Sequence, residues 1–228
     1  MPLSLLLLVP VAYLLGAIPQ VYLLGRMARR DVRKEGDLHQ ALWGASRPLG
    51  VVGIVGDMAK GPIPVAAAWL LGAKPWLIGT VGIAVVIGQM WPVFIPSTGG
   101  KGNTTGLFMA FALAPGLITV ALAPILLSLI IRTAARKAGH HSVLSGPPSN
   151  SLPLGMLTAF SLLPLAAFAA EGRATAITLT VLWSAILLRR LTAGLKADLQ
   201  LSPGKSRVVI NRLLYDRSAA ELPQVKGR

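Results

Sequence analysis

Long apolar runs constrain this chain more than any other feature of its sequence. They occupy roughly residues 3–25, 49–72, 75–95, 104–131, 152–170 and 174–191. A helix needs about 20 apolar residues to cross a bilayer. Of the 228 residues, 54% are hydrophobic and 13% are charged, whereas soluble domains carry about 25% charged residues. The sequence therefore predicts an all-α polytopic membrane bundle and excludes a disordered or ordinary soluble protein.

The first run, residues 3–25, is interpreted as a membrane span that contains Pro10 and Pro19. A secretory signal peptide would begin with a basic segment and have a shorter apolar core. This run has no basic segment before it and is longer than the apolar core of a signal peptide, so we expect it to stay in the membrane.

Positive charge is distributed unevenly along the chain. The segment 26–48 carries six Lys and Arg residues, and the tail from Arg189 to Arg228 carries nine. Because basic segments stay in the cytoplasm, both should lie on that side. With six spans, the tail would lie on the opposite side of the membrane from segment 26–48. About seven spans place both basic segments in the cytoplasm and the N-terminus outside. The 28-residue run 104–131, with its two Ala-Pro steps, is the one to divide.

We expect a membrane-embedded bundle over residues 1–191 and a basic cytoplasmic tail over 192–228. The formal net charge of +14 would by itself suit either nucleic acid or an anionic membrane surface. The apolar runs decide for membrane lipid, so no nucleic-acid partner is expected.

No metal or cofactor is expected from the residue types present. The chain has no cysteine, which excludes disulfides, thiolate catalysis and cysteine-ligated metal. His140 and His141 lie in segment 139–151, a flexible loop by composition, without a third ligand nearby.

A glycine-rich turn with one lysine is the strongest local signal of a ligand site. It reads Gly99-Gly100-Lys101-Gly102 and stands between an apolar run and the next helix. Glycine lets backbone N–H groups converge on an anion, the helix N-terminus adds positive potential, and Lys101 adds a full charge. The turn is not a P-loop, because Gly102 follows the lysine. It is a candidate phosphate cradle; the alternative is a basic turn that only sets topology.

Asp57 and Lys60 lie three residues apart inside the second apolar run, hence on one helix face. Ionisable residues at membrane depth are costly and face the interior of a bundle. They form either an active-site pair or a structural ion pair near the interface, with Lys60 snorkelling from the helix end. The structural reading is favoured, because such a pair satisfies itself.

The basic segment 26–48 is interpreted mainly as a binder of lipid headgroups and a determinant of topology. Arg47 differs from its other cations, because it stands beside Pro48 at the mouth of a span. His39 is alone in this segment and is expected to be solvated.

Four short motifs lie along residues 10–131. They are Gly16-Ala17-Ile18-Pro19, Asp57-Met58-Ala59-Lys60-Gly61, the stretch 88–94 and the glycine turn 99–102. Together they resemble the bacterial acyl-phosphate:glycerol-3-phosphate acyltransferases of the PlsY type. The last two, at unchanged internal spacing, are the most specific match.

The resemblance implies a seven-span bundle in the plasma (inner) membrane, with its site facing the cytoplasm. It implies transfer of a fatty acyl group from acyl phosphate to the sn-1 hydroxyl of glycerol 3-phosphate, giving lysophosphatidic acid without a cofactor. The substrate phosphate is assigned to Arg47, Gly99, Gly100, Lys101 and Gly102. Supporting roles are assigned to Asp57, Lys60, Gln89 and Thr105.

Several positions depart from the family pattern. The family's Ser-Gly-Asn motif is replaced, with Asp37 and His39 at the Ser and Asn positions, and the His of its second motif is Gln89. The C-terminal family motif aligns either with Ser206–Leu213 or with its His at Arg189; both placements lack the His. A non-catalytic relative that binds glycerol 3-phosphate or lipid in a regulatory role is therefore the alternative function.

Overall fold

The computed structural model describes residues 3–32, 38–137, 153–201 and 204–216, and within these residues all regular secondary structure is helical. The helices, in chain order, are η1 (Leu3–Leu7), α1 (Leu8–Ala17), α2 (Gln20–Met27), α3 (Leu38–Ala45), α4 (Arg47–Lys60), α5 (Pro62–Leu70), α6 (Pro75–Met90), η3 (Pro96–Thr98), α7 (Asn103–Leu113), η4 (Pro115–Leu117), α8 (Ile118–Lys137), α9 (Pro153–Ala170), α10 (Arg173–Thr192), α11 (Leu195–Leu201) and α12 (Lys205–Tyr215).

Five helical segments among the described residues are long and apolar enough to cross a membrane. They are Leu3–Met27, Arg47–Leu70, Pro115–Ala134, Pro153–Ala170 and Arg173–Thr192, and α6 and α7 are shorter apolar helices. Large apolar side chains such as Leu70, Leu165 and Phe168 are exposed on the outside. Exposed apolar side chains on helices of this length suit contact with lipid. The predicted all-helical membrane architecture is confirmed.

Proline decides where the apolar runs break. The run 104–131 is divided as expected at Ala114, which has φ −142° and precedes Pro115. A residue before proline avoids the helical region, so α7 ends there. Pro124, by contrast, lies inside α8 without ending it. The first span breaks in the same way at Ile18, ahead of Pro19, which leaves the Ile18 carbonyl outside the helical ladder.

The basic segment 26–48 contains the end of α2, the whole of α3 and the start of α4. Segment 139–151, expected to be a flexible loop, lies outside the described residues.

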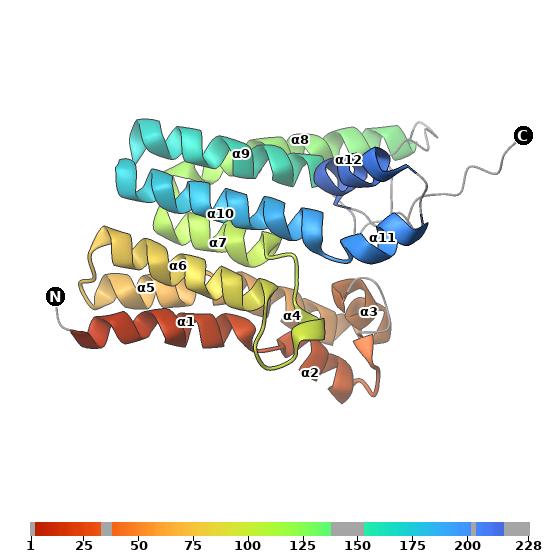
Figure 1. Cartoon of the computed structure of the whole chain (residues 1–228), viewed down its shortest axis with the longest axis horizontal. Helices are drawn as coiled ribbons and strands as arrows, with labels where there is room; N and C mark the ends of the chain where they lie inside the picture. The colour runs from red at the N-terminus through yellow and green to blue at the C-terminus, as the bar shows by residue number, and fades with distance from the viewer. Residues whose placement is uncertain (1–2, 33–37, 138–152, 202–203, 217–228) are drawn as a thin grey trace, which may run out of the picture.

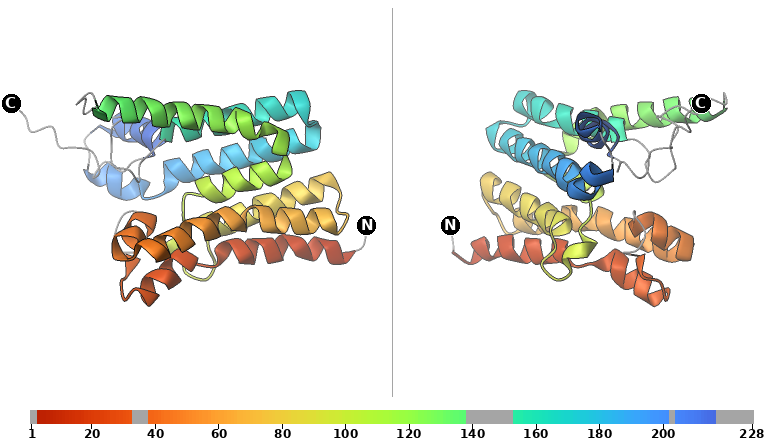
Figure 2. Two further views of the ribbon diagram at one scale, coloured as in Figure 1. Left: turned by 180° about the vertical axis from the view of Figure 1, so that it is seen from behind. Right: turned by 45° about the vertical axis from the view of Figure 1, so that its right-hand side comes forward.

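Helix α1 packs tightly on α6 through a reciprocal pair of glycines. A side chain at Gly16 would meet the backbone carbonyl of Val85, and one at Gly88 would meet that of Tyr13. Helix α6 also contacts α5, α7 and α10, so it lies at the centre of the bundle. Helix α10 packs on α9, and α9 packs on α8 (Figures 1 and 2).

The segments that carry most of the positive charge gather at one end of the bundle. Figure 1 shows α2, α3, the start of α4, the turn between α6 and α7, and α11 and α12 toward the right-hand end. The turns between α5 and α6 and between α9 and α10 lie at the opposite end. The polar groups described next lie between α1, α2, α3, α4 and α6, near the first of these ends.

Candidate functional site

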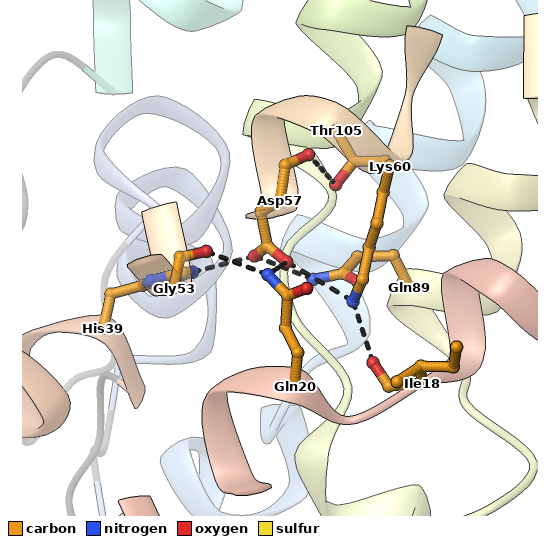
Figure 3. A network of polar contacts seen from close by, with 8 residues as sticks. All are labelled: Ile18, Gln20, His39, Gly53, Asp57, Lys60, Gln89 and Thr105. Atoms are coloured by element: carbon orange, nitrogen blue, oxygen red, sulfur yellow. Dashed lines mark hydrogen bonds and ion pairs between the residues drawn. The ribbon is translucent and has the colours of Figure 1, made fainter. Parts of the chain in front are cut away.

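The carboxylate of Asp57 is the centre of a buried polar network (Figure 3). Asp57 is 3% exposed on α4. Its Oδ1 accepts a hydrogen bond from Gln20 Nε2 at 2.9 Å, and its Oδ2 accepts one from Gln89 Nε2 at 3.0 Å. His39 Nε2 lies 2.9 Å from the same Oδ2. Helices α2, α3 and α6 thus each contribute one side chain to this carboxylate.

Lys60 balances the charge of Asp57 from the same helix. Its Nζ lies 3.4 Å from Asp57 Oδ1, which confirms the expected i,i+3 pair. The ammonium also donates to Gln89 Oε1 at 2.9 Å and to the Ile18 carbonyl at 2.8 Å. Lys60 therefore does not snorkel toward the helix end as expected, because the Ile18 carbonyl at the break between α1 and α2 accepts a hydrogen bond from its ammonium.

His39 and Gln20 are network members that sequence reasoning missed. His39 was expected to be solvated, and this expectation is wrong: it lies on α3, 37% exposed in its side chain, against Asp57. The two residues are 18 positions apart in the chain, so the sequence alone does not reveal the contact. Gln20 did leave a signal, because an amide inside an apolar run needs a partner there.

The network is tied directly to the glycine-rich turn. The Gly100 N–H donates to the carbonyl of Gln89 at 3.0 Å. On the other side of the turn, Thr105 Oγ1 donates to the Asp57 carbonyl at 3.1 Å. Gln89 thus binds the turn on one side, and Asp57 binds the start of α7 on the other. The buried network therefore holds the turn in position.

Two further features fix the shape of the turn. Gly102 has φ +74°, a conformation that favours glycine, and a side chain there would collide with Met90. From α10, Arg189 donates to the Gly99 carbonyl at 2.8 Å and to the Gly100 carbonyl at 3.1 Å. Its guanidinium also lies 5.5 Å from the centroid of the Trp91 ring. The backbone conformation of Gly102 and the bonds from Arg189 to the carbonyls of Gly99 and Gly100 therefore fix the shape of the turn.

The donors that this turn presents are at the start of α7. The Lys101 side chain is 45% exposed, and its Nζ lies 3.3 Å from Asp216 Oδ2. The Asn103 amide is beside it, with Nδ2 3.4 Å from the same oxygen. The first N–H groups of a helix have no partners inside the helix, so α7 adds its own positive end. Together these groups favour an anion.

Arg47 is the assigned residue that the structure does not join to the turn. It is exposed at the first position of α4, ten residues before Asp57. Ten residues of helix span about 15 Å. Arg47 therefore lies at the outer rim of the charged end, away from the buried network.

Both placements of the C-terminal motif now have a structural location. Ser206–Leu213 lie in α12, where Arg212 Nη2 pairs with Asp198 Oδ2 at 2.5 Å. Arg189 instead contacts the glycine turn. Within the described residues, no group of three His, Asp or Glu side chains is arranged to hold a metal ion.

The glycerol-3-phosphate acyltransferase family model matches residues 6–196. This chain belongs to that family. The matched range includes the buried network, the glycine turn and Arg189, and it ends before α12.

Individual relatives agree with the family assignment. A glycerol-3-phosphate acyltransferase of Rubrobacter xylanophilus is 42% identical over 48% of this chain, but the alignment covers only 57% of that relative. One from Geobacter sulfurreducens is 31% identical over 83% of this chain and 94% of its own length. The crystal structure of PlsY in its glycerol 3-phosphate form, an integral membrane glycerol 3-phosphate acyltransferase, matches with TM-score 0.64 and 26% identity. That match covers 87% of this chain and 92% of PlsY.

Proposed function

We propose that this protein is a membrane acyltransferase that acylates the sn-1 hydroxyl of glycerol 3-phosphate, with acyl phosphate as donor. The hydroxyl oxygen attacks the acyl carbon, the bond from that carbon to the phosphate oxygen breaks, and inorganic phosphate leaves. A phosphate oxygen of a substrate accepts the hydroxyl proton. The products are lysophosphatidic acid and phosphate, and the step needs no metal ion or cofactor.

One observation carries this proposal. The exposed ammonium of Lys101 and the half-buried amide of Asn103 lie at the start of α7, on a turn that is anchored to a buried ion pair. Such a turn holds its donors in place before the ligand arrives, which is what recognition of a small phosphate ester requires. Lys101 is the assigned partner of the glycerol 3-phosphate phosphate, with Arg47 as a second cation at the rim.

We further propose that the charged end of the bundle faces the cytoplasm, with α6 and α7 crossing as short spans and the N-terminus outside. The concentration of basic segments at that end supports this orientation. It predicts a cytoplasmic tail and a site in the plasma membrane that is open to soluble glycerol 3-phosphate. Reporter fusions after Arg228 test it, and a tail outside would overturn it.

The decisive experiment supplies the purified protein with acyl phosphate and glycerol 3-phosphate, and measures lysophosphatidic acid and released phosphate. Equal formation of both products is expected. The alternative, a non-catalytic binder, predicts that glycerol 3-phosphate binds without either product. Lys101→Met serves as the site control: it should insert normally yet lose affinity for glycerol 3-phosphate.

A further inference from the structure

The carboxylate of Asp216 occupies the donors that are assigned to the substrate phosphate. Its Oδ2 lies 3.3 Å from Lys101 Nζ and 3.4 Å from Asn103 Nδ2. Its backbone carbonyl accepts a further hydrogen bond from Lys101 Nζ at 2.8 Å. Lys101 and Asp216 are 115 positions apart in the chain. Asp216 directly follows α12, so the contact joins the C-terminal segment to the glycine turn.

Helix α12 is held in place independently of Lys101. Arg212 is 4% exposed and its guanidinium forks onto Asp198, with Nε donating to Oδ2 at 2.7 Å. It also bonds the Ala193 carbonyl where α10 ends. Arg190 adds a bond from Nη1 to the Leu213 carbonyl at 3.3 Å. The end of α10 thus carries α12 and presents the residue that follows it to the turn.

The backbone conformation of Asp216 places its carboxylate beside the glycine turn. Its φ is +51°, and its N–H donates to the Arg212 carbonyl at 3.0 Å, so it caps the end of α12. Asn and Asp enter this backbone region more readily than most residues with a side chain. The side chain is 11% exposed, whereas that of Lys101 is 45% exposed.

We infer that Asp216 is an affinity-determining residue, whose carboxylate competes with the substrate phosphate for Lys101 and Asn103. The inference rests on the proposed function, since it takes Lys101 as the phosphate partner. Two anions cannot share one ammonium and one amide without mutual repulsion. Glycerol 3-phosphate must therefore displace the carboxylate, and the population with a vacant Lys101 sets the apparent affinity. The C-terminal segment thereby raises the KM for glycerol 3-phosphate.

The test is the variant Asp216→Asn, which retains the backbone conformation and the side-chain volume and removes only the charge. We expect the KM for glycerol 3-phosphate to fall about two- to tenfold, the range of a partly exposed charge-assisted contact, while kcat does not fall. Glu171→Gln is the matched control, because it removes one carboxylate at the opposite end of the bundle and should leave both constants unchanged.

A second background separates this inference from the proposed function. In Lys101→Met, the Asp216→Asn change should lower the KM less than it does in the parent protein, because the two anions then share only the Asn103 amide. An unchanged KM in Asp216→Asn, beside a large loss in Lys101→Met, overturns the competition and leaves the proposed function intact. No loss in Lys101→Met overturns the assignment of Lys101 to the substrate phosphate, and the competition with it, whereas the absence of both products in the parent protein overturns the proposed function. A fall in the KM for acyl phosphate alone would show that the competing phosphate is not that of glycerol 3-phosphate.

Discussion

Two ion pairs near the glycine turn differ in almost every physical respect. Asp57 and Lys60 lie on one helix, are 3% and 6% exposed, and are surrounded by neutral amides, an imidazole and a carbonyl. Lys101 and Asp216 come from distant segments, and the lysine is about half exposed. The first pair cannot exchange partners without leaving charge buried in the bundle. The second can exchange its carboxylate for another anion, so the contrast distinguishes a structural ion pair from the proposed ligand site.

The largest expected effect comes from unbalancing the buried pair. Asp57→Asn leaves the Lys60 ammonium buried without its counter-charge, a change that costs about 3–5 kcal/mol in stability. Thermal unfolding of the purified protein in detergent should show a marked loss.

The double variant Asp57→Asn with Lys60→Met tests whether charge balance is the cause. Removing both charges should recover much of the lost stability, because a neutral buried pair carries little desolvation cost. A double variant as unstable as the single one would mean that the hydrogen bonds of Asp57, rather than its pairing, hold the scaffold.

Next in size is the effect of Lys101→Met, and it should appear in kinetics alone. Loss of a charge-assisted contact worth about 1.5–3 kcal/mol lowers kcat/KM for glycerol 3-phosphate by roughly 10–150-fold. The unfolding temperature should stay close to that of the parent. A fall in stability as large as that of Asp57→Asn would erase the distinction between the two pairs.

Lys101→Arg is the companion variant. It should perform better than Met without restoring full activity, since a planar guanidinium does not fit a site shaped for a compact ammonium. Full activity with Arg would favour a turn charge that only sets topology.

Gln89→Leu should have a smaller effect on both readouts, because Gln89 connects the two regions. Its amide serves Asp57 and Lys60, and its carbonyl binds Gly100. Leaving these buried groups without the amide should cost about 1–3 kcal/mol of stability, and the KM for glycerol 3-phosphate should rise. Gln89→His, the residue type of the family motif, should lose less, because imidazole replaces one of the two hydrogen bonds. Equal losses in both variants would mean that the two bonds act only together.

Arg189→Lys should have the smallest effect. Lysine keeps the positive charge but cannot fork onto the two carbonyls of Gly99 and Gly100 or stack as well on Trp91. A loss of about 1 kcal/mol, close to fivefold in kcat/KM, is expected. A loss equal to that of Lys101→Met would instead assign Arg189 a direct contact with substrate.

The sequence was most informative where a single local rule decides the outcome. The six apolar runs include the five helical segments that are long enough to span a membrane, and one of the two Ala-Pro steps, Ala114-Pro115, is where the run 104–131 breaks. Spacing alone predicted the Asp57–Lys60 pair. These features depend on neighbours within a few residues, which a sequence displays directly.

Contacts between distant segments were not predictable in this way. The expectation of a solvated His39 failed because α3 folds back on α4 and brings the imidazole to a carboxylate 18 positions away. The partner of Lys101 was likewise invisible, since Asp216 reaches it only after α12 packs on α10. The glycine turn was recognisable in the sequence, but the groups that hold it in place were not: Gln89 accepts from the Gly100 N–H, and Arg189 donates to the carbonyls of Gly99 and Gly100.

The close approach of α1 and α6 at Gly16 and Gly88 has a consequence for how the protein is made. The two glycines are separated by 72 positions in the chain, and ribosomes add about 5–20 residues per second. For roughly 4–14 seconds after Gly16 is synthesised, the first helix therefore waits for its packing partner. During that interval Asp57 and Lys60 emerge before Gln89, so the nascent bundle must tolerate a half-solvated charge pair. Synthesis of α6 supplies Gln89 and so completes the buried network. A translational pause before α6 would prolong the time during which the charge pair lacks this partner.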